Sequence, residues 1–292
     1  MYHLFTLLGV RVLAFSVIEF LKYLFLGIVQ GLTEVLPVSS SGHVELFKNL
    51  IDLELDNNVI FLIFLNTGSL VTFIIIYFKK LVALAKSFLI FVFKKEKRDE
   101  NKENVTFLMK ILVACIPAGI TGLLLNEIIE ENLVSYSLLV SGIGLLITAT
   151  VLYFVSRVEF IRGHTKISWW DTLFIGLAQA VAILPGVSRS GMTTSTALKR
   201  GNSITTSLNF SFLMYIFISL GSTLLLVKDF FDGGSTIVGA QYIYYSFAFI
   251  ASMIATYFAY KLIFNVFKSG KLRYFSYYCF CVGILAVILF II

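Results

Sequence analysis

Long apolar stretches are the feature that most limits how this chain can fold. Five of them carry no charged side chain and are long enough to cross a bilayer: residues 59–78, 133–155, 201–227, 233–260 and 274–292. A sixth, residues 105–126, is interrupted only by Lys110. About 20 apolar residues in a helix span the hydrocarbon core, where a helix satisfies its own backbone hydrogen bonds. The sequence therefore predicts an all-α polytopic membrane protein with about six transmembrane helices.

The composition agrees with this prediction and argues against several other classes of protein. With 58% hydrophobic and 14% charged residues, the chain is too apolar for a soluble globular domain. Its net charge of +6 suits the basic cytoplasmic loops of a membrane protein better than a nucleic-acid surface, which needs a solvated basic face. The three cysteines lie within apolar stretches, so we expect neither a disulfide nor a cysteine-based metal site.

Two motifs, residues 27–42 (GIVQGLTEVLPVSSSG) and residues 176–191 (GLAQAVAILPGVSRSG), align without a gap at a constant offset of 149 residues. They are identical at six aligned positions: Gly27/Gly176, Gln30/Gln179, Val38/Val187, Ser39/Ser188, Ser41/Ser190 and Gly42/Gly191. Each motif is apolar, runs into a proline, and then opens into small hydroxylated residues and glycine. Because proline ends a helix, we predict two broken helices related by an internal duplication.

The placement of charges predicts how the two motifs enter the membrane. If the second motif crossed completely, the basic loop at residues 261–273 would lie outside, against the positive-inside rule. Re-entry from the cytoplasmic side removes this conflict, and the acidic loop at residues 52–56 places the entry of the first motif outside. We therefore predict two re-entrant helix-loop-helix elements in an inverted-topology repeat. The chain would form one membrane domain, 1–292, with repeats at about 1–132 and 133–292 and an uncleaved N-terminal helix over residues 1–20.

Polar side chains gather in both motifs. Gln30 and Glu34 are one helical turn apart and share a face. Beyond the prolines lie the other polar and small residues: Ser39, Ser40, Ser41, Gly42 and His43 in the first motif, and Ser188, Arg189, Ser190 and Gly191 in the second. Hydroxyls, backbone amides and the arginine would all direct donors at an anion, and ionisable groups at membrane depth are usually functional. We expect the two motifs to meet and to form one phosphate-binding site.

The segments QGLTEVLPVSSSGH (residues 30–43) and PGVSRSG (residues 185–191) resemble the two signature motifs of the bacterial undecaprenyl-diphosphate phosphatase family, which is associated with bacitracin resistance. The resemblance implies an enzyme that hydrolyses undecaprenyl diphosphate to undecaprenyl phosphate and inorganic phosphate at the outer side of the plasma membrane. That reaction recycles the lipid carrier for peptidoglycan synthesis. The resemblance also implies the site residues: catalytic Glu34, His43, Ser40 and Arg189; phosphate-binding Ser39, Ser41, Gly42, Ser188, Ser190 and Gly191; and metal-binding Glu34 and Gln30.

Two positions depart from the family pattern. Gln30 stands where glutamate is common, which removes one candidate ligand charge for the expected divalent cation, Mg²⁺ or Ca²⁺. Asn209 stands where an arginine is common, which weakens the positive field on the phosphate. The attacking group stays open among His43, Ser40 and an activated water.

The expected partners are a prenyl diphosphate substrate and membrane lipids, with a homodimer left open. An alternative function is that of a lipid-carrier transporter or flippase, which would bind the headgroup at the repeat interface without hydrolysis. The sequence does not indicate the preferred prenyl chain length. Phosphate release distinguishes the two functions.

Overall fold

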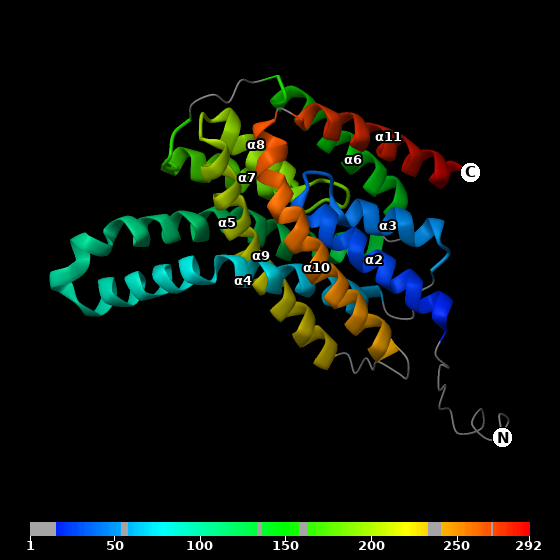
Figure 1. The fold of residues 1–292 in the computed structure, drawn as a ribbon, viewed down its shortest axis with the longest axis horizontal. Helices are drawn as coiled ribbons and strands as arrows, with labels where there is room; N and C mark the ends of the chain where they lie inside the picture. The colour runs from blue at the N-terminus through cyan, green and yellow to red at the C-terminus, as the bar shows by residue number, and fades with distance from the viewer. Residues whose placement is uncertain (1–15, 54–57, 133–135, 158–162, 233–240, 270) are drawn as a thin grey trace.

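The computed structural model describes residues 16–53, 58–132, 136–157, 163–232, 241–269 and 271–292, and these residues form helices without any β-strand (Figure 1). In chain order the α-helices are α2 (Val17–Val35), α3 (Ser40–Leu50), α4 (Asn58–Phe93), α5 (Arg98–Asn132), α6 (Ser137–Val155), α7 (Trp169–Val181), α8 (Arg189–Lys199), α9 (Ile204–Asp232), α10 (Gln241–Lys268) and α11 (Leu272–Ile291). A short 3-10 helix, η1 (Lys95–Lys97), joins α4 to α5. The all-α prediction is confirmed. Residues 1–15 of the expected N-terminal helix and residues 54–56 of the acidic loop lie outside the described residues.

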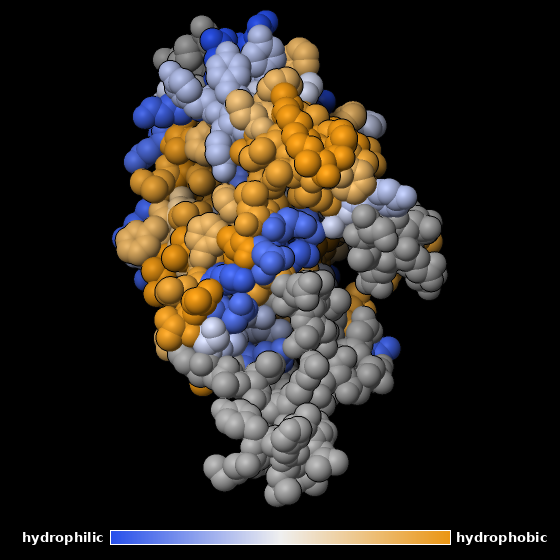
Figure 2. Space-filling model, turned by 90° about the vertical axis from the view of Figure 1, so that its right-hand side faces the viewer, coloured by the Kyte–Doolittle hydropathy of each residue, from blue (hydrophilic) through white to orange (hydrophobic). Residues whose placement is uncertain are grey.

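Six of the described helices are long and apolar enough to cross a membrane: α4, α5, α6, α9, α10 and α11. This confirms the six expected crossings by length and composition. Large apolar side chains such as Phe258 and Phe280 are exposed on the outside of the bundle, and Figure 2 shows apolar side chains over much of one face. A water-soluble protein rarely exposes such surfaces, whereas lipid chains would cover them.

Helices α4 and α5 extend beyond the predicted crossings and form a hairpin that projects from the other helices (Figure 1). Helix α4 has 36 residues, about 54 Å at the usual rise per residue, which exceeds the hydrocarbon thickness of a bilayer. The charged segment 94–110 is helical apart from the connection around η1. Its lysines and glutamates are good helix formers, and Asn104 donates a hydrogen bond to Ser87 across the hairpin at 2.9 Å.

The first helix of each motif packs against a helix of the opposite half of the chain. Helix α2 packs against α10, and α7 packs against α5. Gly27 of α2 lies against the backbone of Ala248, and the aligned Gly176 of α7 lies against Ala114, whose carbonyl oxygen would be 2.7 Å from an added Cβ. Small residues allow two helix backbones to approach this closely. The matching contacts support the duplication, while the membrane depth of the broken helices stays a prediction.

The interior beside the two motifs is aromatic. The ring of Phe73 on α4 lies 4.9 Å from the rings of both Phe212 and Tyr215 on α9. All three side chains are buried. This packing joins α4 to α9 and places their inner faces next to the polar ends of the motifs.

Candidate active site

Each motif consists of a helix, a turn that contains a proline, and a second helix, as the sequence predicts. The turns comprise residues 36–39 between α2 and α3, and residues 182–188 between α7 and α8. A motif serine caps each second helix: Ser39 Oγ accepts from the Gly42 N–H at 3.3 Å, and Ser188 Oγ accepts from the Gly191 N–H at 3.1 Å. Gly42 and Gly191 therefore contribute to the caps. A cavity lies between the two motifs, and neither glycine lines it.

The turn of each motif contacts the first residues of the second helix in the other motif. Ser190 Oγ donates to the Leu36 carbonyl oxygen at 3.2 Å, and the Gly186 N–H donates to Ser41 Oγ at 3.3 Å. Gly186 has a φ of 83°, and an added Cβ would collide with the backbone of Ser141, so only glycine fits here without strain. The motifs thus build one composite site.

A cavity of about 60 Å³, which has room for several water molecules, opens where the two motifs meet. Its lining comes from both of them: Thr33, Glu34, Ser39, Ser40 and Ser41 from the first, and Ala182, Val187, Ser188, Arg189 and Ser190 from the second. The lining thus includes the first residues of α3 and α8. Amides at helix N-termini and hydroxyl groups favour an anion, so the cavity suits a phosphate.

Glu34 is the carboxylate of this cavity, and its side chain is 6% exposed. Its Oε2 accepts hydrogen bonds from Ser40 Oγ at 2.5 Å and from Gln30 Nε2 at 2.9 Å. The Gln30 amide therefore helps to orient the carboxylate. A carboxylate in contact with a hydroxyl group can accept its proton, which is the geometry of an activated serine nucleophile.

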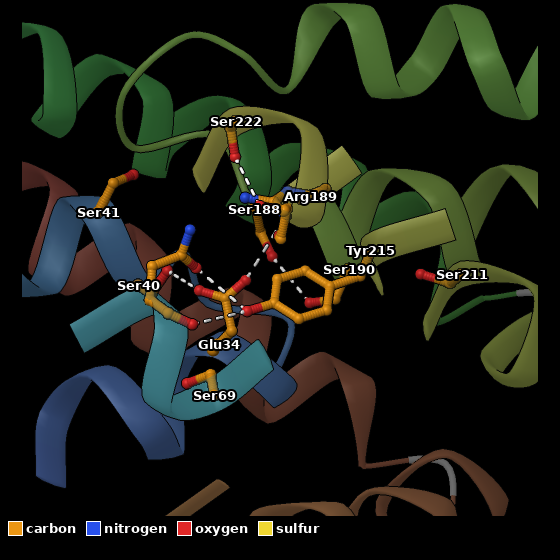
Figure 3. A network of polar contacts seen from close by, with 12 residues as sticks. Glu34, Ser40, Ser41, Ser69, Ser188, Arg189, Ser190, Ser211, Tyr215 and Ser222 are labelled. Atoms are coloured by element: carbon orange, nitrogen blue, oxygen red, sulfur yellow. Dashed lines mark hydrogen bonds and ion pairs between the residues drawn. The ribbon is translucent and has the colours of Figure 1, made fainter. Parts of the chain in front are cut away.

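Arg189, the first residue of α8, supplies positive charge to the cavity (Figure 3). Its Nη1 lies 3.9 Å from Glu34 Oε1 and donates to Ser219 Oγ at 3.1 Å. Its Cζ lies over the ring of Tyr215, 4.9 Å from the centroid. The sequence reasoning missed Tyr215 and Ser219, which lie in an uncharged transmembrane stretch. Their spacing of four residues was the available signal, because it places both on one face of a helix.

His43 lies behind the first turn and does not line the cavity. The side chain is buried, with Nδ1 2.8 Å from the Ser39 carbonyl oxygen and Nε2 2.8 Å from the Tyr278 hydroxyl. The His43 and Tyr278 rings are stacked. Both ring nitrogens thus have partners within the protein, and the structure brings Ser40, rather than His43, to the cavity.

The chain is similar to known proteins over most of its length. A family model described as bacitracin resistance protein BacA matches residues 23–285. The chain belongs to this family. It is 41% identical over 266 residues to an undecaprenyl-diphosphatase of Oceanobacillus iheyensis, covering 91% of this chain and 95% of that protein. It is 38% identical over 268 residues to undecaprenyl-diphosphatase 3 of Bacillus anthracis, covering 92% and 97% of the two chains. For an undecaprenyl-diphosphatase of Acholeplasma laidlawii the identity is 37% over 281 residues, covering 94% and 99%.

The two departures from the family pattern lie in different places in this BacA-family chain. Gln30 reaches the site through its hydrogen bond to Glu34. Asn209 does not line the cavity, and it accepts a hydrogen bond from the Tyr77 hydroxyl at 2.7 Å. Asn209 therefore forms a polar contact between α9 and α4.

The BacA-family site offers a divalent cation few protein ligands. Within the described ranges, no three His, Cys, Asp or Glu side chains gather in a way that could hold a metal ion. Glu34 contributes the carboxylate of the cavity lining, and Gln30 directs its amide nitrogen at Glu34. One carboxylate beside several hydroxyls suits Mg²⁺, because this ion usually completes its shell with waters and substrate phosphates. The donor set therefore fits an ion shared with the substrate.

An ion pair joins the start of α7 to the end of α8, the two ends of this helix pair that lie farthest along the chain from the turn between them. Arg200 Nε, just beyond α8, lies 2.8 Å from Asp171 Oδ1 in the first turn of α7, and Asp171 forms a capping box with Ser168. Burial alone would raise the pKa of Asp171, but hydrogen bonds from Ser168 and Arg200 outweigh burial and lower this pKa. The ion pair ties α7 to α8 and so helps to fix the turn that precedes Arg189.

Proposed function

We propose that the chain is an undecaprenyl-diphosphatase, which hydrolyses undecaprenyl diphosphate to undecaprenyl phosphate and inorganic phosphate and so recycles the lipid carrier for cell-wall synthesis. The observation that carries this proposal is the contact between Ser40 and Glu34 in a cavity that Arg189 also lines. The nucleophile Ser40, its base Glu34 and the phosphate-binding side chain Arg189 meet among apolar helices, where a polyprenyl chain can lie. The names of the relatives in Oceanobacillus and Bacillus support the same activity.

The reaction proceeds in two steps at Ser40. Ser40 Oγ attacks the terminal phosphorus while Glu34 accepts the hydroxyl proton, and the bond from that phosphorus to the bridging oxygen breaks. Glu34 passes the proton to the departing undecaprenyl phosphate, and the transferred phosphoryl group stays on Ser40 as an ester. Water then hydrolyses this ester, which releases inorganic phosphate and restores the Ser40 hydroxyl.

Arg189 and the amides of both helix N-termini bind the negative charge that spreads over the transferred phosphoryl oxygens. These donors are held by the caps and by contacts between the motifs, so they need little rearrangement during the reaction. Glu34 would hold a Mg²⁺ or Ca²⁺ ion, and such an ion would supply further positive charge for the phosphates.

The proposal places the reaction at the outer side of the plasma membrane, because the charge pattern places the entry of the first motif there. A homodimer is compatible with this proposal but is not required by it. Both motifs that line the cavity come from one chain.

A carrier that binds the headgroup without hydrolysis is the second candidate function. The matched contacts of α2 with α10 and of α7 with α5 favour it, because paired broken helices are common in transporters. Purified protein in detergent, supplied with a prenyl diphosphate and Mg²⁺, distinguishes the candidates. A phosphatase releases inorganic phosphate, and Glu34→Ala abolishes the release. Binding of the prenyl diphosphate without release would support the carrier.

A further inference from the structure

The guanidinium of Arg189 does not make close contact with the nearest carboxylate. Its Nη1 stops 3.9 Å from Glu34 Oε1, although a charged pair in a protein interior gains energy from close, paired hydrogen bonds. The Arg189 side chain is 31% exposed and that of Glu34 only 6%, so little water surrounds the carboxylate. Other contacts must therefore hold the guanidinium where it lies.

Helix α9 provides those contacts. The Tyr215 ring faces the guanidinium, with its centroid 4.9 Å from Arg189 Cζ, and Ser219 Oγ accepts a hydrogen bond from Nη1 at 3.1 Å. The two residues are one helical turn apart, so one face of α9 presents both. Tyr215 and Ser219 are 4% and 1% exposed, and a cation over a desolvated ring gains more than one in water.

The Tyr215 ring is fixed in turn by α4. Its hydroxyl donates to Asn66 Oδ1 at 3.1 Å, and its ring packs against Phe73. The offset of 149 residues that aligns the two motifs also relates Asn66 to Tyr215. The ring is therefore anchored by a contact between corresponding positions of the two halves.

Glu34, Arg189 and Tyr215 share one small space. A second cavity beside the first is lined by all three side chains (Figure 3). Because Arg189 Nη1 lies only 3.9 Å from Glu34 Oε1, a small shift of the guanidinium would bring the two groups into contact when the contacts with α9 are lost. Such a movement would neutralise both the phosphate-binding charge and the base.

We propose that Tyr215 and Ser219 are positioning residues, which hold Arg189 away from Glu34 so that the guanidinium can bind the terminal phosphate. Glu34 then stays free to accept the Ser40 proton. The inference rests on the proposed function for its catalytic consequence, whereas the effect on anion binding can be measured separately. Tyr215 and Ser219 act through Arg189 and do not touch the reacting atoms.

The test compares four variants of the full-length protein in detergent: Tyr215→Leu, Tyr215→Phe, Ser219→Ala and Ser222→Ala. We would measure steady-state kinetics with a prenyl diphosphate and Mg²⁺, and the Kd for inorganic pyrophosphate. Tyr215→Leu removes the ring and should raise both KM and this Kd about tenfold, the loss expected for a desolvated cation–π contact. Tyr215→Phe keeps the ring and should recover most of that affinity.

Ser222 provides the matched control for Ser219. Its hydroxyl donates to the Ser219 carbonyl oxygen of the same helix, so Ser222→Ala should leave the Kd for pyrophosphate unchanged. Ser219→Ala should raise this Kd measurably, because Arg189 Nη1 loses its acceptor. If Tyr215→Leu fails to fold, the comparison of Ser219→Ala with Ser222→Ala decides the question.

A double-mutant cycle with Arg189→Ala tests whether Tyr215 acts through the arginine. In the Arg189→Ala background, Tyr215→Leu should change the Kd for pyrophosphate less than about twofold. Equal losses in the Leu and Phe variants, or an undiminished effect without Arg189, would overturn the inference. A wild-type protein that binds pyrophosphate but releases no phosphate would refute the proposed function and leave the binding comparison intact.

Discussion

At the scale of single residues, Ser40 bears the central chemical step. Because its Oγ lies 2.5 Å from Glu34 Oε2, we expect Ser40→Ala to lower the rate of phosphate release about 10³-fold or more with little change in melting temperature. Ser41→Ala is the matched comparison and should lose less, since the Ser41 hydroxyl contacts the Gly186 N–H.

A trapping experiment gives the Ser40 prediction its sharpest form. A prenyl diphosphate labelled in its terminal phosphate should leave label on acid-quenched wild-type protein and none on Ser40→Ala. Label retained by Ser40→Ala would place the phosphoryl group on another side chain.

The contact between His43 and Tyr278 yields a second residue-scale prediction. Tyr278→Phe removes the partner of His43 Nε2, and an unpaired buried polar atom costs about 1–3 kcal/mol. We therefore expect a lower melting temperature and a kcat within about tenfold of the wild-type value. A much larger loss of kcat with an unchanged melting temperature would show that His43 takes part in the chemistry.

How far the sequence predicts the site depends on how local each contact is. Glu34, Ser40 and Arg189 lie in two short aligned motifs, so residue type and spacing were enough to single them out. The contacts of Tyr215 and Ser219 with Arg189 depend on how α9 packs against α8, which no local pattern encodes. The burial of His43 behind the turn depends in the same way on α11, which carries Tyr278.

At the scale of helices, Gly27 and Gly176 allow close packing between helix backbones, and larger side chains at these positions test it. Gly27→Val and Gly176→Val would push side chains into the backbones of Ala248 and Ala114, and such overpacking costs about 1–3 kcal/mol. We expect both variants to lose thermal stability in detergent. Gly221→Ala is the control, because no atom lies within 4 Å of its added Cβ. Equal melting temperatures for all three variants would contradict the close helix packing.

The ion pair between Asp171 and Arg200 predicts a dependence of stability on pH. The pKa of Asp171 is lowered in the folded protein from an ordinary value of 3.8. Its stabilising effect is therefore complete above pH 3.8 and is lost as the pH falls through the lower, folded pKa. Asp171→Asn should thus reduce the melting temperature at neutral pH, and its difference from wild type should shrink in strong acid. A difference that grows as the pH falls would be inconsistent with this ion pair.

The sequence predicted the helices well where hydropathy alone decides them. The six crossings follow from apolar length, and the two motif helices end near their prolines as expected. The extension of α4 and α5 into one long hairpin did not follow, because a run of charged residues is equally typical of a loop. Packing between the two helices, including the contact of Asn104 with Ser87, decides their helical state.

At the scale of the whole molecule, the two halves exchange contacts. The first helix of each motif packs on a helix of the other half, and the turn of each motif forms a hydrogen bond with the second helix of the other motif. The two motifs contribute different groups to the site, because the first carries Glu34 and Ser40 while the second carries Arg189. Neither half holds a complete site.

This composite site is the central claim, and phosphate release tests it most directly. Wild-type protein in detergent, supplied with a prenyl diphosphate and Mg²⁺, should release inorganic phosphate. Glu34→Ala from the first motif and Arg189→Ala from the second should each lower the rate by orders of magnitude at an unchanged melting temperature. Release at the wild-type rate by either folded variant, or no release by the wild-type protein, would contradict the account.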